Sequence, residues 1–227
     1  MAKKIYLIGG SKGGVGKSMV SMATIDYLKE QGESILLIES DTSNPDVWKG
    51  YHDSVETELV NLDDVDGWIQ LINLCDSKPD SIVVINTAAR NNTGVSAYGT
   101  TLNSTLAELK RDLVTLWVIN RQRDSLELLK EYMDAIPDTL VHVVRNGYFG
   151  DEKKFELYNG SKIRSAVESR GGQSLNFPDL ADRVSDDLYS KRLSIAKALK
   201  ELPIGNRAEL SRWQGEVKKT LAAVIHE

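Results

Sequence analysis

A short glycine-rich segment near the amino terminus has the residue types and spacing needed to bind phosphate. Gly13, Gly14 and Gly16 have no Cβ, so successive backbone N–H groups can turn inward toward an anion. Lys17 and Ser18 follow directly, where a helix is expected to begin with its positive end facing the same anion. The Lys17 ammonium would reach the β- and γ-phosphates of a nucleotide, and the Ser18 hydroxyl would bind Mg²⁺.

Two acidic residues form a second candidate feature. Glu39 and Asp41 follow the apolar run 35–38, so both fall where a buried strand is expected to end. In open α/β sheets, ligands bind beyond the carboxyl ends of the strands. The pattern therefore predicts that these carboxylates lie near the phosphate loop, and the alternative for Asp41 is a solvent-exposed acid at a strand end.

The apolar runs of the chain predict a scaffold that brings these strand ends together. They are continuous rather than alternating, which is typical of strands buried on both faces. Helix-like stretches separate them, as in βαβ units with right-handed crossovers. The sequence therefore predicts an α/β fold in three layers, with a mostly parallel central sheet covered by helices on both faces. The predicted strands are residues 5–8, 34–38, 81–85, 114–119 and 140–144.

Several segments between the strands are predicted as helices. Residues 17–31 form the first, which ends before Gly32 as a C-terminal glycine. Asp124 is expected to cap a later helix, with Glu127 as its capping-box partner. Residues 64–74 form another helix, whose buried face is expected to contain Val65, Trp68, Ile69, Ile72 and Cys75.

The rest of the chain shows no internal repeat and no low-complexity linker, so residues 1–227 are expected to form a single domain. Residues 91–105 are polar and predict a mobile loop that enters a helix, and residues 147–160 predict another polar connection. Residues 204–227 predict a C-terminal amphipathic helix. We expect this helix to pack on the domain rather than on a membrane, because its polar face mixes lysines with glutamates. Its apolar positions are Leu210, Trp213, Val217, Leu221 and Val224.

Composition limits the classes of protein. The 227 residues are 41% hydrophobic and 27% charged with a net charge of −5, unlike a strongly basic nucleic-acid-binding domain. Cys75 is the only cysteine, which excludes an intramolecular disulfide and a multi-cysteine metal site, and it is expected to be a small buried apolar residue. The residues before the first predicted strand lack the long apolar region of a signal peptide, and no apolar run approaches the ~20 residues that span a bilayer. We therefore expect a cytoplasmic protein.

The loop departs from the strict phosphate-loop pattern at one position and adds a second lysine. Ser11 stands where the pattern G-x-x-x-x-G-K-[ST] has glycine, and Lys12 follows it. With these residues the segment resembles the deviant Walker A ATPases, the ParA/MinD family. The resemblance implies a P-loop NTPase sandwich, ATP and Mg²⁺ as cofactors, and a homodimer that forms on ATP. In that family the extra lysine reaches the partner's phosphates, so Lys12 is expected to act in catalysis together with Lys17; the alternative is a solvated loop lysine.

The same resemblance implies roles for the residues at the strand ends. The family has D-x-D where this chain has Glu39 and Asp41, and its second aspartate positions the attacking water, which assigns this catalytic role to Asp41. Asn86 stands where the family has an aspartate that holds Mg²⁺ through a water, next to the direct ligand Ser18. An amide oxygen can accept a hydrogen bond from metal-bound water but adds no negative charge. This substitution predicts weaker Mg²⁺ binding or slow hydrolysis.

Further residues are expected to contact the nucleotide by the same resemblance. Val15 and Met19 belong to the loop and its helix, although many relatives have threonine at the position of Met19. Asn146 matches an asparagine that contacts adenine, and Pro178 lies in a segment that closes over the base. The alternative for Asn146 and Pro178 is a structural role. A basic surface for non-specific DNA is a further possibility, although acids interleave with its residues: Lys153, Lys154, Lys162, Arg164, Arg170, Lys191 and Arg192.

The resemblance favours a ParA-like ATPase that acts in plasmid or chromosome partition, plasmid stability or conjugative transfer. The length of the chain and its segment 39–46 are most similar to those of small plasmid-encoded members, the StbB, MobD and VirC1 types. A plasmid-encoded partner of the centromere-binding or relaxosome type is expected, and hydrolysis is expected to be slow and partner-stimulated. The alternatives are a P-loop metabolic ligase of the dethiobiotin-synthetase type and a nucleotide-dependent scaffold with negligible hydrolysis. Nitrogenase-like electron transfer is excluded, since one cysteine per subunit cannot hold a shared cluster.

Overall fold

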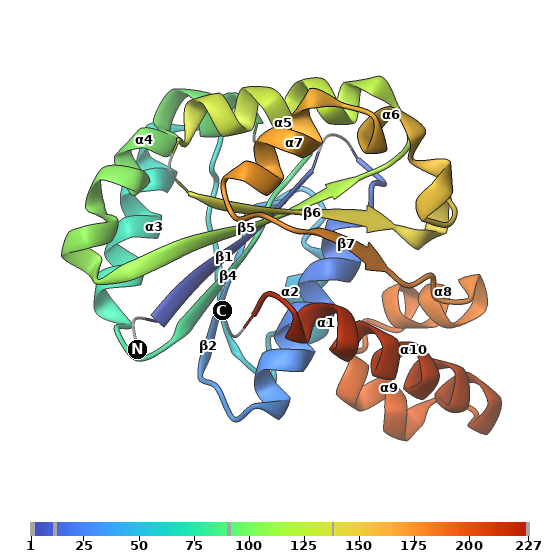
Figure 1. Cartoon of the computed structure of the whole chain (residues 1–227). Helices are drawn as coiled ribbons and strands as arrows, with labels where there is room; N and C mark the ends of the chain where they lie inside the picture. Colours follow the sequence, from blue (N-terminus) through green and yellow to red (C-terminus); the bar gives the residue numbers. More distant parts are fainter. Residues whose placement is uncertain (1–2, 11–12, 90–91, 138, 226–227) are drawn as a thin grey trace.

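The residues that the structure describes form a seven-stranded parallel sheet. The computed structural model describes residues 3–10, 13–89, 92–137 and 139–225 (Figure 1). The strand order is β3-β2-β4-β1-β5-β6-β7, and every pair of neighbouring strands is parallel. The strands are β1 (Lys3–Gly10), β2 (Ile35–Glu39), β3 (Glu56–Leu59), β4 (Ile82–Asn86), β5 (Arg111–Ile119), β6 (Leu140–Asn146) and β7 (Ser174–Phe177). Because β1 is the central strand, the loop that follows it opens in the middle of the sheet's carboxyl edge.

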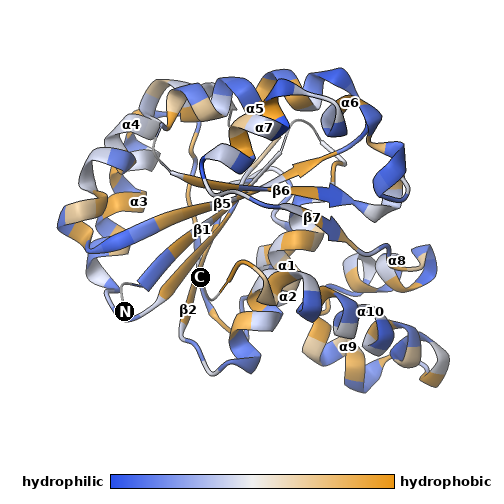
Figure 2. Ribbon diagram, viewed as in Figure 1, coloured by the Kyte–Doolittle hydropathy of each residue, from blue (hydrophilic) through white to orange (hydrophobic). Residues whose placement is uncertain are grey.

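Helices cover both faces of this sheet, and each face has its own apolar core (Figure 1). Tyr6 and Ile8 of β1 pack in the core beneath α1, whereas Ile5 and Leu7 pack in the opposite core. Figure 2 shows the largely apolar strands between helices of mixed hydropathy. Burial on both faces explains why the strands are continuously apolar, and the predicted α/β fold is confirmed. One layer contains α1 (Lys17–Glu30), α2 (Asp46–Tyr51), α8 (Asp182–Ser190), α9 (Ile195–Glu201) and α10 (Ile204–Ala222), and the other contains α3 (Val65–Ser77), α4 (Asn92–Leu109), α5 (Arg123–Ala135), α6 (Glu156–Asn159) and α7 (Lys162–Ser169).

The C-terminal helix α10 packs on the domain as predicted. Its apolar positions are buried in the same core as β1 and α1. Gln214 donates a hydrogen bond to Asp26 of α1 at 2.7 Å, and the Tyr6 hydroxyl donates to the carbonyl of Ile225 at 2.7 Å. The middle of the helix is therefore joined to α1, and the residues that follow the helix are joined to β1. Within the described part of the chain, no helix is both long and apolar enough to cross a membrane.

The prediction of a mobile loop over residues 91–105 was wrong, because this segment belongs largely to α4. Its apolar side chains recur at helical spacing and face the neighbouring helices, with Val95 and Leu102 buried. A Cβ on Gly94 would lie 1.9 Å from the carbonyl oxygen of Leu62, so glycine permits a close contact between this helix and the chain before α3. The glycines that indicated a loop therefore allow close helix packing, and the Ser and Thr residues largely occupy the solvent-facing side of the helix.

Helix α3 was predicted with the right N-terminus and with a buried face that is only partly right, since Trp68 and Cys75 are buried as expected. Asp64 caps it by accepting a hydrogen bond from the Gly67 amide at 3.0 Å. Val65 and Ile69 are 47% and 49% exposed, so the predicted face points partly to solvent. The buried face is one position further round and contains Trp68, Leu71 and Cys75. Burial of Cys75 agrees with its prediction as a small apolar residue and raises the pKa of its thiol to about 11.

Two further local predictions were wrong. Helix α5 begins at Arg123 with Gln122 as its N-cap and no side-chain cap, so Asp124 lies inside the first turn rather than at the cap. Residues 147–160 are not a plain connection, because they contain the short helices η1 (Gly147–Phe149), η2 (Glu152–Lys154) and α6. This segment is anchored by Phe155 and Tyr158, each 1% exposed.

The short edge strands β3 and β7 were not predicted. Gly32, by contrast, has φ +79° after α1 and is the expected C-terminal glycine.

Arg111 joins the amino edge of the sheet to the end of α3. It is 4% exposed, and its guanidinium donates to the carbonyls of Ser81 at 2.8 Å and Cys75 at 3.2 Å, and also to Lys78. A helix leaves its last carbonyls without intrahelical partners, and this arginine supplies donors to them.

We predict that Arg111→Ala lowers the free energy of unfolding by about 2–4 kcal/mol, because several buried carbonyls lose their donors at once. Urea denaturation measures this difference. The control is Arg212→Ala on α10, whose ion pairs with Glu209 and Glu216 are solvent-exposed and should contribute far less. Equal losses in both variants would contradict the role assigned to Arg111.

Candidate functional site

The predicted phosphate loop lies at the carboxyl edge of the sheet, between β1 and α1. Helix α1 begins at Lys17, as predicted. Gly14 has φ +75° and Gly16 has φ +103°, left-handed conformations in which a side chain would be strained. The backbone of the loop therefore requires both glycines, and its N–H groups precede the positive end of the helix. Ser11 and Lys12 lie outside the described residues.

Asn146, at the end of β6, holds this loop in place. Its Nδ2 donates to the carbonyl of Val15 at 2.9 Å, and its Oδ1 accepts from the Tyr148 amide at 3.1 Å. A Cβ on Gly16 would lie 2.3 Å from Asn146 Nδ2, so a residue larger than glycine would displace this side chain. The structure thus gives Asn146 a role in shaping the loop, in line with the structural alternative that the sequence left open. Its contact with adenine stays a prediction.

A cavity of about 470 Å³, which we call the lysine cavity, opens beside the loop. Lys17 is only 7% exposed, and burial lowers the pKa of its ammonium to about 8, against the opposing effect of the Asp41 carboxylate. Asp41 Oδ1 accepts from the Asn44 amide at 3.1 Å, which fixes the turn after β2. The structure therefore brings Lys17, Ser18 and Asp41 together. The lining residues are Gly13, Gly14, Gly16, Lys17, Ser18, Asp41, Asn44, Asp46, Thr87, Ala89 and Tyr189.

A buried polar pair lies at the ends of β2 and β4. Glu39 is fully buried and Asn86 is 2% exposed, and Asn86 Nδ2 donates to Glu39 Oε1 at 2.8 Å. Burial raises the pKa of Glu39 to about 7, although its hydrogen bonds from Asn86 and from the Asp41 amide oppose this. Asn86 is not among the described residues that line the lysine cavity, whereas the next residue, Thr87, is. Its predicted role toward Mg²⁺ stays a prediction.

A second cavity of about 160 Å³, the proline cavity, lies on the other side of the loop. The backbone of Pro178 is held by α10, since Trp213 Nε1 donates to its carbonyl at 2.9 Å. The Phe177 and Trp213 rings meet edge to face at 5.7 Å and form an apolar wall. Five residues predicted to contact the nucleotide therefore converge here: Gly14, Gly16, Met19, Asn146 and Pro178. The full lining is Gly14, Gly16, Met19, Asn146, Tyr148, Phe177, Pro178, Asp179, Leu180, Asp182, Ser185, Tyr189 and Trp213.

The sequence did not point to two aromatic residues of the site. Tyr189 of α8 lines both cavities, together with Gly14 and Gly16, so the two cavities adjoin at the loop. Tyr148 lines the proline cavity and is 63% exposed. Tyr148 could have been predicted as a site residue, because it lies two residues after Asn146, which the sequence already placed at the nucleotide. Tyr189 had none, because only the packing of α8 beside α2 brings it to the loop.

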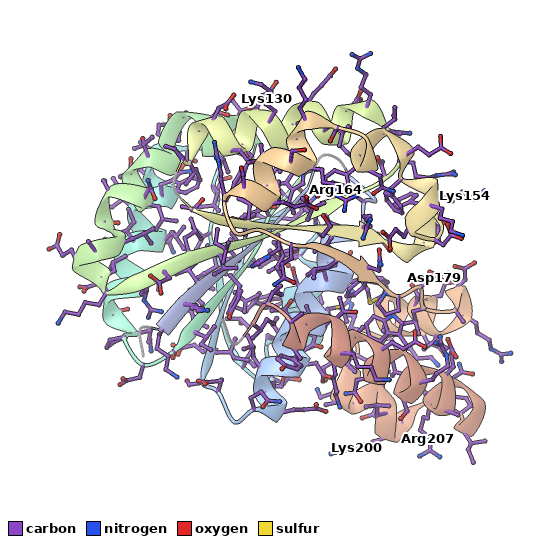
Figure 3. The ribbon with its side chains drawn as sticks, in the orientation of Figure 1. Lys130, Lys154, Arg164, Asp179, Lys200 and Arg207 are labelled. Atoms are coloured by element: carbon purple, nitrogen blue, oxygen red, sulfur yellow. The ribbon has the colours of Figure 1, made fainter. Side chains whose placement is uncertain are left out.

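The basic residues considered as a DNA surface are partly neutralised. Arg164 pairs with Glu168 at 2.7 Å and Lys191 pairs with Asp187 at 2.7 Å. Figure 3 shows Lys154 near one end of the sheet and Lys200 and Arg207 on the α9–α10 layer, with Asp179 between them. Of the labelled cations, only Lys154 and Arg164 belong to the basic set considered from the sequence, and the ion pairs of Arg164 and Lys191 agree with the expectation that acids interleave with this set.

Comparisons with known proteins agree with this geometry. Residues 6–146 match the family described as CobQ/CobB/MinD/ParA nucleotide binding domain. The chain is 82% identical over 227 residues to Protein MobD of Acidithiobacillus ferrooxidans, and the alignment covers 100% of both chains.

Solved structures show the same fold at low identity. The MinD cell division protein of Aquifex aeolicus has a TM-score of 0.60 and 13% identity, over 97% of each chain. The MinC:MinD cell division protein complex of Aquifex aeolicus has a TM-score of 0.58 and 14% identity, over 99% of this chain and 96% of the other. From the matched residues and the loop between β1 and α1, the chain belongs to the CobQ/CobB/MinD/ParA family of nucleotide-binding domains.

Proposed function

We propose that this protein is an ATPase of the ParA/MinD type that binds ATP and Mg²⁺, dimerises on ATP and acts in plasmid stability, partition or conjugative transfer. The observation that carries the proposal is the pair of adjoining cavities that share Gly14 and Gly16. The lysine cavity offers an ammonium, a hydroxyl and backbone N–H groups to phosphates. The proline cavity offers a largely apolar wall, formed by Phe177 and Trp213, to a base. A nucleotide needs these two environments on either side of one phosphate loop.

The residues of the lysine cavity fit the proposed chemistry. The loop amides and Lys17 would hold the phosphates, and Ser18 would supply an oxygen to the metal. Mg²⁺, when bound, neutralises phosphate charge and orients the phosphate oxygens. The carboxylate of Asp41 lines the same cavity and can orient a water molecule toward the phosphates, while the Asn44 amide holds its side chain.

The role in plasmid biology is supported by the relationship to Protein MobD, which is 82% identical. The length of the chain and its segment 39–46 also resemble small plasmid-encoded ATPases associated with stability and conjugative transfer. We propose a plasmid-encoded partner of the centromere-binding or relaxosome type, which stimulates a slow basal hydrolysis. If the protein does not bind duplex DNA, and DNA does not stimulate phosphate release, the role in partition loses support and conjugative transfer is the remaining role.

A nucleotide-dependent scaffold with negligible hydrolysis is the second candidate. The observation that favours it is Asn86, an uncharged amide that is 2% exposed and pairs with Glu39. An amide contributes no negative charge toward Mg²⁺, so the metal would be held less tightly than by a carboxylate. ATP binding without measurable phosphate release, in the presence of every candidate partner, would support this scaffold.

We predict that ATP affinity falls as the pH rises above about 8. The pKa of Lys17 is lowered to about 8 in the free protein, whereas phosphates stabilise the charged form. Binding must therefore take up a proton above this pH, and affinity should fall about tenfold per pH unit. Calorimetry between pH 7 and 9.5, in buffers of different ionisation enthalpy, measures both effects. In Lys17→Arg, any remaining binding should be independent of pH across this range. Equal affinity of the wild type at pH 7 and 9.5 would contradict the assignment.

We predict that Asp41→Ala reduces the rate of ATP hydrolysis by roughly 10²–10⁴-fold, because the attacking water loses its acceptor. The affinity for ATP should change by less than about threefold, because the phosphate contacts remain. Phosphate release and calorimetry measure the two quantities. The control is Asp80→Asn, an exposed residue before β4 at the opposite edge of the sheet. Unchanged hydrolysis in Asp41→Ala would assign the water to another group.

We predict that ATP and Mg²⁺ convert the protein from monomer to dimer, and that Lys12→Ala prevents this conversion. The reason is that a lysine acting on the partner's phosphates stabilises charge only when two subunits meet. Sedimentation velocity with and without nucleotide is the measurement. The exposed Lys110 lies beyond α4, and Lys110→Ala is the matched control. A wild-type monomer under both conditions would refute the role of Lys12 in trans.

A further inference from the structure

A chain of buried hydrogen bonds connects the phosphate-binding helix to the segment that carries Asp41. Ser21 of α1 donates from Oγ to Asn86 Oδ1 at 2.9 Å, and Asn86 Nδ2 donates to Glu39 Oε1 at 2.8 Å. Glu39 then accepts from the backbone amide of Asp41 at 3.0 Å. Ser21, Asn86 and Glu39 are all at most 2% exposed. Water therefore does not compete for these bonds, and each loss would leave a buried polar group unpaired.

The carboxylate of Glu39 holds two parts of the following segment. Oε1 accepts from the Asp41 amide at 3.0 Å, and Oε2 accepts from the Trp48 amide at 3.4 Å, inside the first turn of α2. Between these two amides lies the turn that contributes Asn44 and Asp46 to the lysine cavity. One side chain thus ties both ends of this turn to the end of β2.

The direction of each bond is fixed by the donors available. In its ionised form the carboxylate of Glu39 only accepts hydrogen bonds, and the amide of Asn86 offers it an N–H from the neighbouring strand in addition to the Asp41 and Trp48 amides. Glu39 and Asn86 are direct neighbours in the parallel register of β2 and β4. An aspartate at position 86 would place acceptor oxygens against Glu39 and offer no donor. The longer acid at position 39 and the amide at position 86 therefore match each other.

We propose that Glu39 and Asn86 form a matched pair that positions Asp41. The carboxylate of Glu39 fixes the backbone of the Asp41 segment, and Asn86 orients that carboxylate and links it through Ser21 to α1. Ser21 lies one helical turn after Ser18, on the helix that Lys17 begins. Glu39 is thus a positioning residue, and the catalytic part of this inference rests on the proposed function of Asp41.

The first test is a double-mutant cycle read by thermal unfolding, without nucleotide. Asn86→Asp alone should lower the melting temperature by about 6–10 °C, because two carboxylates then share one buried site. In the Glu39→Asp background the side chain at position 39 is shorter by one methylene, so its carboxylate lies farther from position 86. Adding Asn86→Asp to this background should therefore lower the melting temperature by less than half as much as in the wild type. Asn103→Asp on α4 is the control for introducing an aspartate. Equal shifts in both backgrounds would overturn the pairing.

The second test separates positioning from stability. Glu39→Ala should lower kcat for ATP at least tenfold with KM nearly unchanged, since the phosphate contacts of Lys17 remain while Asp41 loses its anchor. Glu39→Gln keeps an acceptor oxygen for Asn86 and the Asp41 amide, and should recover kcat to within about threefold of the wild type. An equal loss in both variants would overturn the positioning role.

The two tests keep this inference distinct from the proposed function. If the wild type binds ATP but releases no phosphate, the hydrolytic function fails, while the unfolding cycle still decides whether Glu39 and Asn86 are paired. If Asp41→Ala abolishes hydrolysis but the cycle is additive, the function stands and the matched pair is refuted. A wild type that binds no nucleotide would contradict the proposed function alone.

Discussion

The hydrogen bond from Asn146 to the carbonyl of Val15 is the contact on which the geometry of the site depends. It joins the end of β6 to a loop whose glycines adopt left-handed conformations, and so holds the loop against the sheet. Gly16 must lack a Cβ both for its backbone conformation and to leave room for this amide. Because the loop also forms the boundary between the two cavities, the same contact determines where each cavity begins.

The two cavities share Gly14, Gly16 and Tyr189, and the rest of each is built by different parts of the chain. Apart from Tyr189, the lysine cavity is formed by segments that follow β1, β2 and β4, so the parallel sheet itself brings these residues together. The proline cavity depends on the C-terminal helices, since Trp213 of α10 holds Pro178 and α8 contributes Tyr189. The C-terminal helix is therefore part of the site as well as of the core. Weakened packing of α10 would disturb the proline cavity before the lysine cavity.

Sequence patterns predicted what depends on local chemistry and on strand burial. The glycines, Lys17 and Ser18 lie in one short segment whose spacing has a single geometric meaning, and the central strands are continuously apolar. The prediction failed where a tertiary contact decides the outcome. Gly94 belongs to a helix because it packs against the Leu62 carbonyl, and Tyr189 reaches the site only through the packing of α8. The short strands β3 and β7 lie at the sheet edges, where hydrophobic patterning is weak.

The charges at the lysine cavity bear on the proposed dimer. Among the described residues that line it, the charged ones are Lys17, Asp41 and Asp46, and Asp46 is paired with Lys49 at 3.1 Å. Asp41 alone offsets Lys17, so the described side chains that line the cavity add almost no net positive charge beyond the loop amides. A nucleoside triphosphate with one Mg²⁺ still carries about two negative charges, which a low-dielectric site must balance. In the proposed dimer, a lysine delivered by the second subunit would supply that balance, and assembly would then be the step that completes the site.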